Sequence, residues 1–143
     1  VEEKLFDVLG QSADEEHRAM TATALGYARQ STRQIRALVD AAGDASSEVR
    51  NNAVRALGVL LESNAKLRGS VPVRVFTDMV QSGTWSDRNK GTYVLMELAA
   101  SNDRALLHEI EVAAADALQE MAQWQSSGHA YAARMLLGRI SKP

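Results

Sequence analysis

The sequence contains no cysteine, and this absence removes several chemistries at once. Without a thiol the chain has no disulfide framework, no thiolate zinc site and no cysteine nucleophile. Proline is almost absent too, occurring only at Pro72 and Pro143. Since alternation of apolar and polar residues is also scarce, the sequence predicts an all-α fold.

The sequence has no large excess of charge of either sign, because it contains 16 basic and 18 acidic residues and its net charge is -2. Such a chain lacks the overall basic surplus that drives binding to a phosphate backbone. Most of the basic residues are arginines, whose planar fork suits fixed pairs with carboxylates. Charges also interrupt every apolar run well short of the roughly 20 residues that a membrane span needs.

The length of 143 residues, of which 45% are apolar, is that of one domain with a core of its own. We therefore expect a single repeat domain over residues 1–143. No targeting segment is evident, and the first residue is Val rather than Met, which indicates an excised segment or a processed product. These features do not predict a compartment.

Apolar periodicity predicts eight helices, at residues 2–10, 13–29, 31–42, 46–62, 71–82, 86–100, 103–124 and 128–140. The breaks between them fall at residues that favour turns and caps, as at Gly43-Asp44 and Ser82-Gly83. The carboxylates of Asp14, Glu15 and Glu16 open the second helix, where negative charge complements free N–H groups. We interpret them as capping residues.

Four of these helices share one apolar template. In the clearest copy, Ala53, Ala56, Leu57, Leu60 and Leu61 fall on one helix face. The template recurs around Leu25, Leu95 and Leu137, and with Leu57 these markers are separated by 32, 38 and 42 residues. Such spacing indicates stacked helical hairpins. Each copy opens with a small residue that allows close helix approach: Thr21, Ala53, Gly91 or Ala133.

The stretch "DASSEVRNNAVRALGVL", residues 44–60, resembles the first helix of a HEAT repeat. The resemblance rests on Asp44, Val49-Arg50, Ala53, Leu57 and Gly58. It implies an armadillo-like α-solenoid, a right-handed α-α superhelix of about seven to eight helices. Second helices would line its concave surface. The pattern departs at His17, Asp87 and Ala130.

The resemblance also implies roles for particular residues. In the family, aspartates and arginines of successive repeats form a ladder of contacts, which makes Arg18, Asp44, Arg50 and Arg88 structural inter-repeat residues here. Residues 2–10 resemble a second helix whose first helix is absent. We therefore expect a fragment of a longer array.

Catalytic and metal-binding patterns are scarce. The three histidines, His17, His108 and His129, include no pair at the spacing that binds a metal from one helix face. The His108-Glu109 pair occurs once, whereas the HEAT-like deoxyhypusine hydroxylases repeat it in several helices. No phosphate-binding loop or nucleophile elbow is present. We expect no catalytic residue, no metal and no cofactor.

Candidate binding residues lie on the second helices, opposite their apolar faces. On residues 103–124 the expected core stripe is Leu106, Ile110, Ala113, Ala117, Leu118 and Met121. The partner-binding candidates on the three second helices are Arg33, Arg36, Arg74, Asp78, Arg104, His108 and Glu111. The alternative is a helix surface that is merely solvated. Trp85 and Trp124, near helix ends, fit packing between repeats better than an exposed anchor for a partner.

The leading hypothesis is a non-enzymatic scaffold that binds a protein partner through its concave face as a monomer. One alternative is an enzyme or enzyme accessory, since some HEAT-like proteins are DNA glycosylases or bilin lyases. Fold analogy is its only support. The other alternative is nucleic-acid binding through a local row of arginines.

Overall fold

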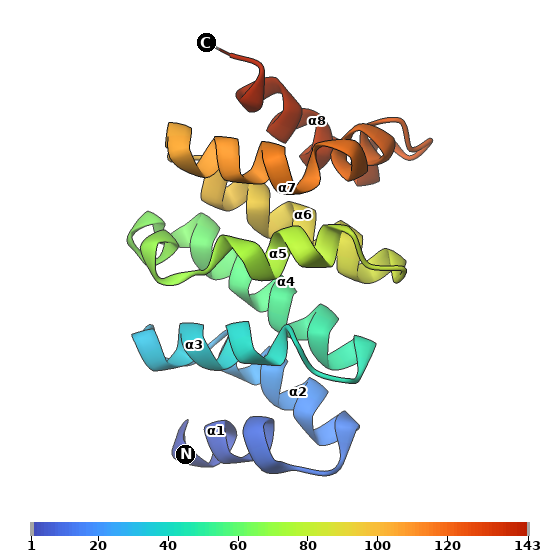
Figure 1. Cartoon of the computed structure of the whole chain (residues 1–143). Helices are drawn as coiled ribbons and strands as arrows, with labels where there is room; N and C mark the ends of the chain where they lie inside the picture. The colour runs from blue at the N-terminus through green and yellow to red at the C-terminus, as the bar shows by residue number, and fades with distance from the viewer. Residues whose placement is uncertain (1, 143) are drawn as a thin grey trace. The chain divides into compact units, whose positions relative to one another are not determined.

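The computed structural model describes residues 2–142, which form eight α-helices and one 3₁₀ helix with no strand among them. Backbone contacts divide the chain into two compact units, Val1–Pro72 and Val73–Pro143, here the N-terminal and C-terminal units (Figure 1). All eight predicted helices are present. The all-α prediction is confirmed.

The N-terminal unit contains α1 (Glu2–Gln11), α2 (Glu15–Leu25), α3 (Thr32–Ala41), α4 (Ser47–Ser63) and the 3₁₀ helix η1 (Ala65–Ser70). Helices α2 and α4 pack against each other, and α1 and α3 form a second layer against them (Figure 1). The core between the layers consists of fully buried side chains, the largest being Leu25, Ile35, Leu38, Leu57 and Leu61. Each buried leucine or isoleucine contributes about 1.5–3 kcal/mol of transfer free energy.

The C-terminal unit contains α5 (Val73–Val80), α6 (Trp85–Ala99), α7 (Arg104–Ala122) and α8 (Ser127–Ile140). Helix α5 packs on α6 and α7 packs on α8, while α5 contacts α7 and α6 contacts α8. Figure 1 shows α5 and α7 lying side by side with α6 behind them. Phe76, Leu95, Ile110, Leu118 and Leu136 are fully buried in its core.

Side-chain caps set several helix starts. Asp14 accepts hydrogen bonds from the backbone N–H groups of Glu16 at 2.9 Å and His17 at 3.3 Å, which confirms its capping role. These bonds also hold the pKa of Asp14 below its ordinary value, the bond from His17 contributing most. Asp103 caps α7 in the same way, accepting from the N–H groups of Ala105 and Leu106. Such caps satisfy N–H groups that the first helical turn leaves without partners.

One predicted helix end was wrong, and one predicted break contains a short helix. The helix predicted to reach residue 29 ends at Leu25, where the buried Gln34 side chain donates its Nε2 to the carbonyls of Leu25 at 2.6 Å and Ala28 at 3.2 Å. The gap predicted between residues 62 and 71 contains η1, which begins where the Asn64 side chain accepts from the N–H of Lys66. Both differences arise from side-chain hydrogen bonds that apolar periodicity does not register.

The predicted core stripe of α7 was also partly wrong. Ala113 is exposed, and Leu106 and Ala117 are only half-buried. The buried positions are Leu107, Ile110, Ala114, Leu118 and Met121. Since α7 carries apolar residues around most of its circumference, its sequence allows two neighbouring stripes, and packing against α5 and α8 selects one. The candidates Arg104, His108 and Glu111 still point to solvent.

Candidate partner-binding surface

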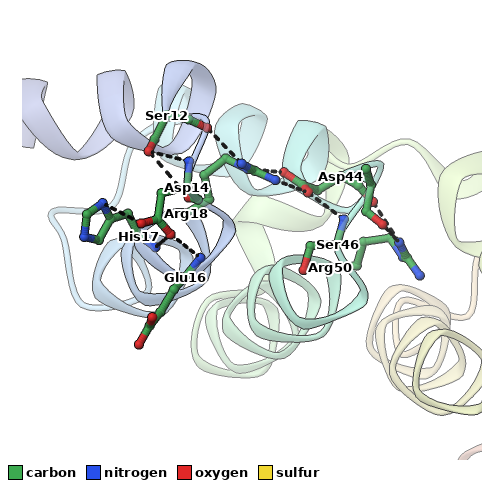
Figure 2. Close-up of polar contacts among 9 residues, drawn as sticks. Ser12, Asp14, Glu16, His17, Arg18, Asp44, Ser46 and Arg50 are labelled. Atoms are coloured by element: carbon green, nitrogen blue, oxygen red, sulfur yellow. Dashed lines mark hydrogen bonds and ion pairs between the residues drawn. The ribbon is translucent and has the colours of Figure 1, made fainter.

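Arg18 joins two consecutive hairpins of the N-terminal unit. From α2 its Nε and Nη2 donate to the two carboxylate oxygens of Asp44, just before α4, at 2.8 and 2.9 Å (Figure 2). Its Nη1 donates to the Ser12 carbonyl at 2.8 Å. The Arg18 and Asp44 side chains are only 15% and 13% exposed. The hydrogen bonds from Arg18 hold the pKa of Asp44 below its ordinary value, although burial opposes this.

Asp44 and Arg50 organise the start of α4. The Asp44 carboxylate accepts from the N–H of Ser46 at 2.8 Å, and Arg50 Nη1 donates to the carbonyls of Asp44 at 2.8 Å and Ala45 at 3.0 Å (Figure 2). Arg50 therefore holds the carbonyl six residues before it, as Arg18 holds that of Ser12. These two bonds tie Arg50 to the turn that precedes α4.

The turn at Asp44 recurs before two other first helices. Ser12 Oγ accepts from the N–H of Asp14 at 3.2 Å, and Ser82 Oγ accepts from the N–H of Thr84 at 3.0 Å. These turn residues have the same spacing as the marker leucines Leu25, Leu57 and Leu95. Sequence reasoning missed this repeated turn, because a serine replaces the aspartate in two of its copies.

Arg88 makes a different contact from Arg18. Its Nη1 and Nη2 donate to the Glu120 carboxylate at 3.1 and 3.0 Å, which ties α6 to α7, and its Nε donates to the Val80 carbonyl at 3.1 Å. Its guanidinium also lies 5.3 Å from the ring centre of the half-buried Trp124. The hydrogen bonds from Arg88 hold the pKa of Glu120 below its ordinary value. Arg88 and Trp124 thus take part in packing between helices.

Trp85 is less enclosed than Trp124. Its side chain is 51% exposed, and its ring meets that of His129 edge-on with centroids 4.8 Å apart. This contact joins the start of α6 to the start of α8. Trp85 therefore fits both interpretations made from the sequence: part of its ring packs against another helix, and the rest is exposed as an anchor for a partner would be.

Two of the predicted binding residues lie on α3. Arg33 forms an exposed ion pair with Glu3 of α1 and lies over the Phe6 ring, 4.2 Å from its centre. Arg36 is exposed. Both guanidinium groups are thus accessible, and one of them is already engaged by an acidic residue of the same unit.

The other five lie on α5 and α7 of the C-terminal unit. Arg74 and Asp78 form a loose pair at 3.9 Å, and His108 Nδ1 lies 3.6 Å from a Glu111 carboxylate oxygen. The Arg74 and His108 side chains are 88% and 75% exposed. Arg104 donates to the Lys142 carbonyl at 2.8 Å. Because α5 and α7 are neighbours, these residues form mixed-charge pairs on adjacent helices.

Over residues 2–142 no group of three or more His, Asp or Glu side chains is arranged to hold a metal ion. His108 meets Glu111 in an exposed pair, and Glu109 takes no part in that contact. None of the helices described in this range is long and apolar enough to span a membrane.

Paired helices packed as hairpins, with an arginine joining one hairpin to the next, define a helical-repeat protein. A family model described as HEAT repeats matches residues 2–96, and the chain belongs to the HEAT repeat family. The solenoid class predicted from the sequence is confirmed. No curated protein matches the chain.

A solved structure supports the same fold. It is the crystal structure of an engineered protein, a Northeast Structural Genomics Consortium target, with 22% sequence identity and a TM-score of 0.76. The match covers 96% of this chain, and this chain spans 61% of the length of the engineered protein. At that identity the likeness shows the fold alone.

Proposed function

We propose that this HEAT-repeat scaffold is non-enzymatic and binds a protein partner through the exposed faces of its second helices, α3, α5 and α7. The supporting observation is the contrast between two arginines of the first helices and the exposed arginines of the second helices. On the first helices, Arg18 and Arg88 are committed to bidentate carboxylate contacts and are 15% and 18% exposed.

On the second helices the cations are held weakly. Arg33 is 54% exposed and Arg74 is 88% exposed, each with one carboxylate partner. Exposed ion pairs of this kind contribute only about 0–1 kcal/mol, so a partner can replace them at little cost. Arginine is also enriched at the centres of protein interfaces. The second helices thus carry groups available for recognition, whereas Arg18 and Arg88 on the first helices hold the fold.

The test is affinity capture from a lysate with the full chain as bait. The double variant Arg36→Ala/Arg74→Ala removes one exposed guanidinium from α3 and one from α5, and neither takes part in the core. The matched control is Arg55→Ala, which removes an exposed guanidinium from the first helix α4. We expect the double variant to lose proteins that both the wild-type chain and the control retain.

Two outcomes would contradict the proposal. One is a set of captured proteins that the double variant and the control retain equally. The other is specific retention of nucleic acid, with affinity that falls steeply as salt rises, because that dependence identifies phosphate contacts.

A further inference from the structure

An open groove of about 460 Å³ runs between the start of α7 and the end of α8. It lies partly on the first helix α8 and shares only α7, through Arg104, with the second-helix faces proposed above. Its volume falls within the range of about 300–1,000 Å³ that is usual for ligand sites. Four cationic residues and two apolar ones are among those that line it: Arg104, Arg134, Arg139 and Lys142, with Leu107 and Met135.

No carboxylate is among the residues that line this groove. The sequence from residue 121 to residue 143 contains no Asp or Glu, although it carries three of the four cations. Asp103 precedes Arg104, and its carboxylate accepts hydrogen bonds from the N–H groups of Ala105 and Leu106 at the start of α7. In a chain of net charge -2, positive charge is therefore concentrated here.

The three guanidinium groups are held in place by neutral acceptors. Arg104 donates to the Lys142 carbonyl at 2.8 Å, Arg134 to the Ala122 carbonyl at 2.8 Å, and Arg139 to the Asn102 side-chain oxygen at 2.6 Å. These bonds orient the side chains without neutralising their charge. Since a guanidinium has five N–H donors, each can bind a ligand without losing its anchor.

We propose that this groove docks an acidic segment of a partner protein, through Asp or Glu carboxylates. A carboxylate matches the arginine fork in a bidentate arrangement, and Leu107 and Met135 provide apolar contact for the methylene groups of such a segment. A protein partner fits better than single-stranded nucleic acid, because no aromatic side chain lines the groove to stack on a base.

Gly138 permits a test that removes no existing contact. It lies on α8 at the groove, and a Cβ built there meets no atom within 4 Å. Gly138→Glu therefore places a carboxylate among the four cations, and Gly138→Gln adds the same shape without charge. Gly10→Glu adds the same charge on α1, at another position where a Cβ meets nothing within 4 Å.

The probe is a fluorescein-labelled hexaglutamate peptide, titrated with each full-length variant and followed by fluorescence anisotropy. We expect Gly138→Glu to weaken peptide binding by at least about tenfold. The new carboxylate competes with the peptide for the guanidinium groups, so the peptide loses charge-assisted hydrogen bonds. Gly138→Gln and Gly10→Glu should stay within about twofold of the wild-type chain, because neither changes charge in the groove. Arg36→Ala/Arg74→Ala should also bind the peptide normally, which separates this proposal from the proposed function.

Several results would overturn the proposal. They are undetectable peptide binding by the wild-type chain, equal weakening by Gly10→Glu and Gly138→Glu, or tighter binding of a single-stranded DNA oligonucleotide than of the peptide. Sedimentation tests a further occupant: self-association of the wild-type chain that Gly138→Glu abolishes would assign the groove to a second copy. Thermal unfolding of every variant verifies that the changes in binding do not come from loss of fold.

Discussion

Replacing Gly91 by alanine tests how closely α5 and α6 approach each other. A Cβ at Gly91 would lie 2.8 Å from the Met79 Cβ and 3.3 Å from the Phe76 carbonyl oxygen. Carbon atoms prefer a separation of about 3.5–4.0 Å, so α5 must move by roughly 1 Å. Because the obstructing atom is a Cβ and not the flexible end of a side chain, rotamer changes cannot relieve the contact.

The expected cost can be estimated from two opposing terms. Overpacking a close contact costs about 1–3 kcal/mol, whereas alanine is favoured over glycine inside a helix by about 1 kcal/mol. We expect Gly91→Ala to lower the free energy of unfolding by about 1 kcal/mol overall. Gly138→Ala is the matched control on α8, where a new Cβ meets nothing within 4 Å. It should raise the free energy of unfolding by about 0.5–1 kcal/mol.

Urea denaturation of the full chain, followed by circular dichroism, measures both variants. The two should differ by about 2 kcal/mol, with Gly138→Ala above the wild-type chain and Gly91→Ala below it. Equal stability of the two variants would refute the inference that a small residue at position 91 is required by the close packing of α5 and α6.

Three other changes probe single contacts. The pKa of Asp44 is depressed in the folded state by Arg18, so its stabilisation is complete above its ordinary pKa and is lost as pH falls through the depressed value. Asp44→Asn should therefore be less stable than the wild-type chain near pH 7, and the difference should shrink in urea titrations at falling pH. Gln34→Leu removes the hydrogen bonds from Nε2 to the carbonyls of Leu25 and Ala28 and should cost about 1–3 kcal/mol, measured by thermal unfolding. Asn102 has a φ of 55°, so Asn102→Ala should cost about 1 kcal/mol in the same assay and Asn102→Gly less. Equal losses for the two Asn102 variants would contradict that reasoning.

The fold was predictable because its signals are local and repeated. Apolar periodicity located every α-helix of residues 2–142, and the recurrence of Leu25, Leu57, Leu95 and Leu137 every 32 to 42 residues indicated stacked hairpins before any contact was known. Gly91 was recognised in the same way as a small residue at a position of close approach. Each of these predictions needs only the order of apolar and small residues within a single helix, because that order determines which residues share a face.

Only part of the candidate surface could be predicted from the sequence in the same way. The positions of Arg33, Arg74 and His108 on exposed faces followed from the helical period. The groove between α7 and α8 did not, because Arg104 and Arg139 are distant in the sequence and converge only when the two helices pack. Its signal in the sequence, a C-terminal stretch without carboxylates, becomes informative once the groove is known.

By itself, the sequence determined that this protein is helical, that its helices pair into repeats and that Arg18, Arg50 and Arg88 occupy a recurring position. Tertiary structure decided which stripe of α7 is buried, that Arg88 binds Glu120, and where α2 ends. The physical reason is the range of the interactions. Periodicity and capping act within a few residues, whereas ion pairs, buried amides and grooves depend on which helices meet.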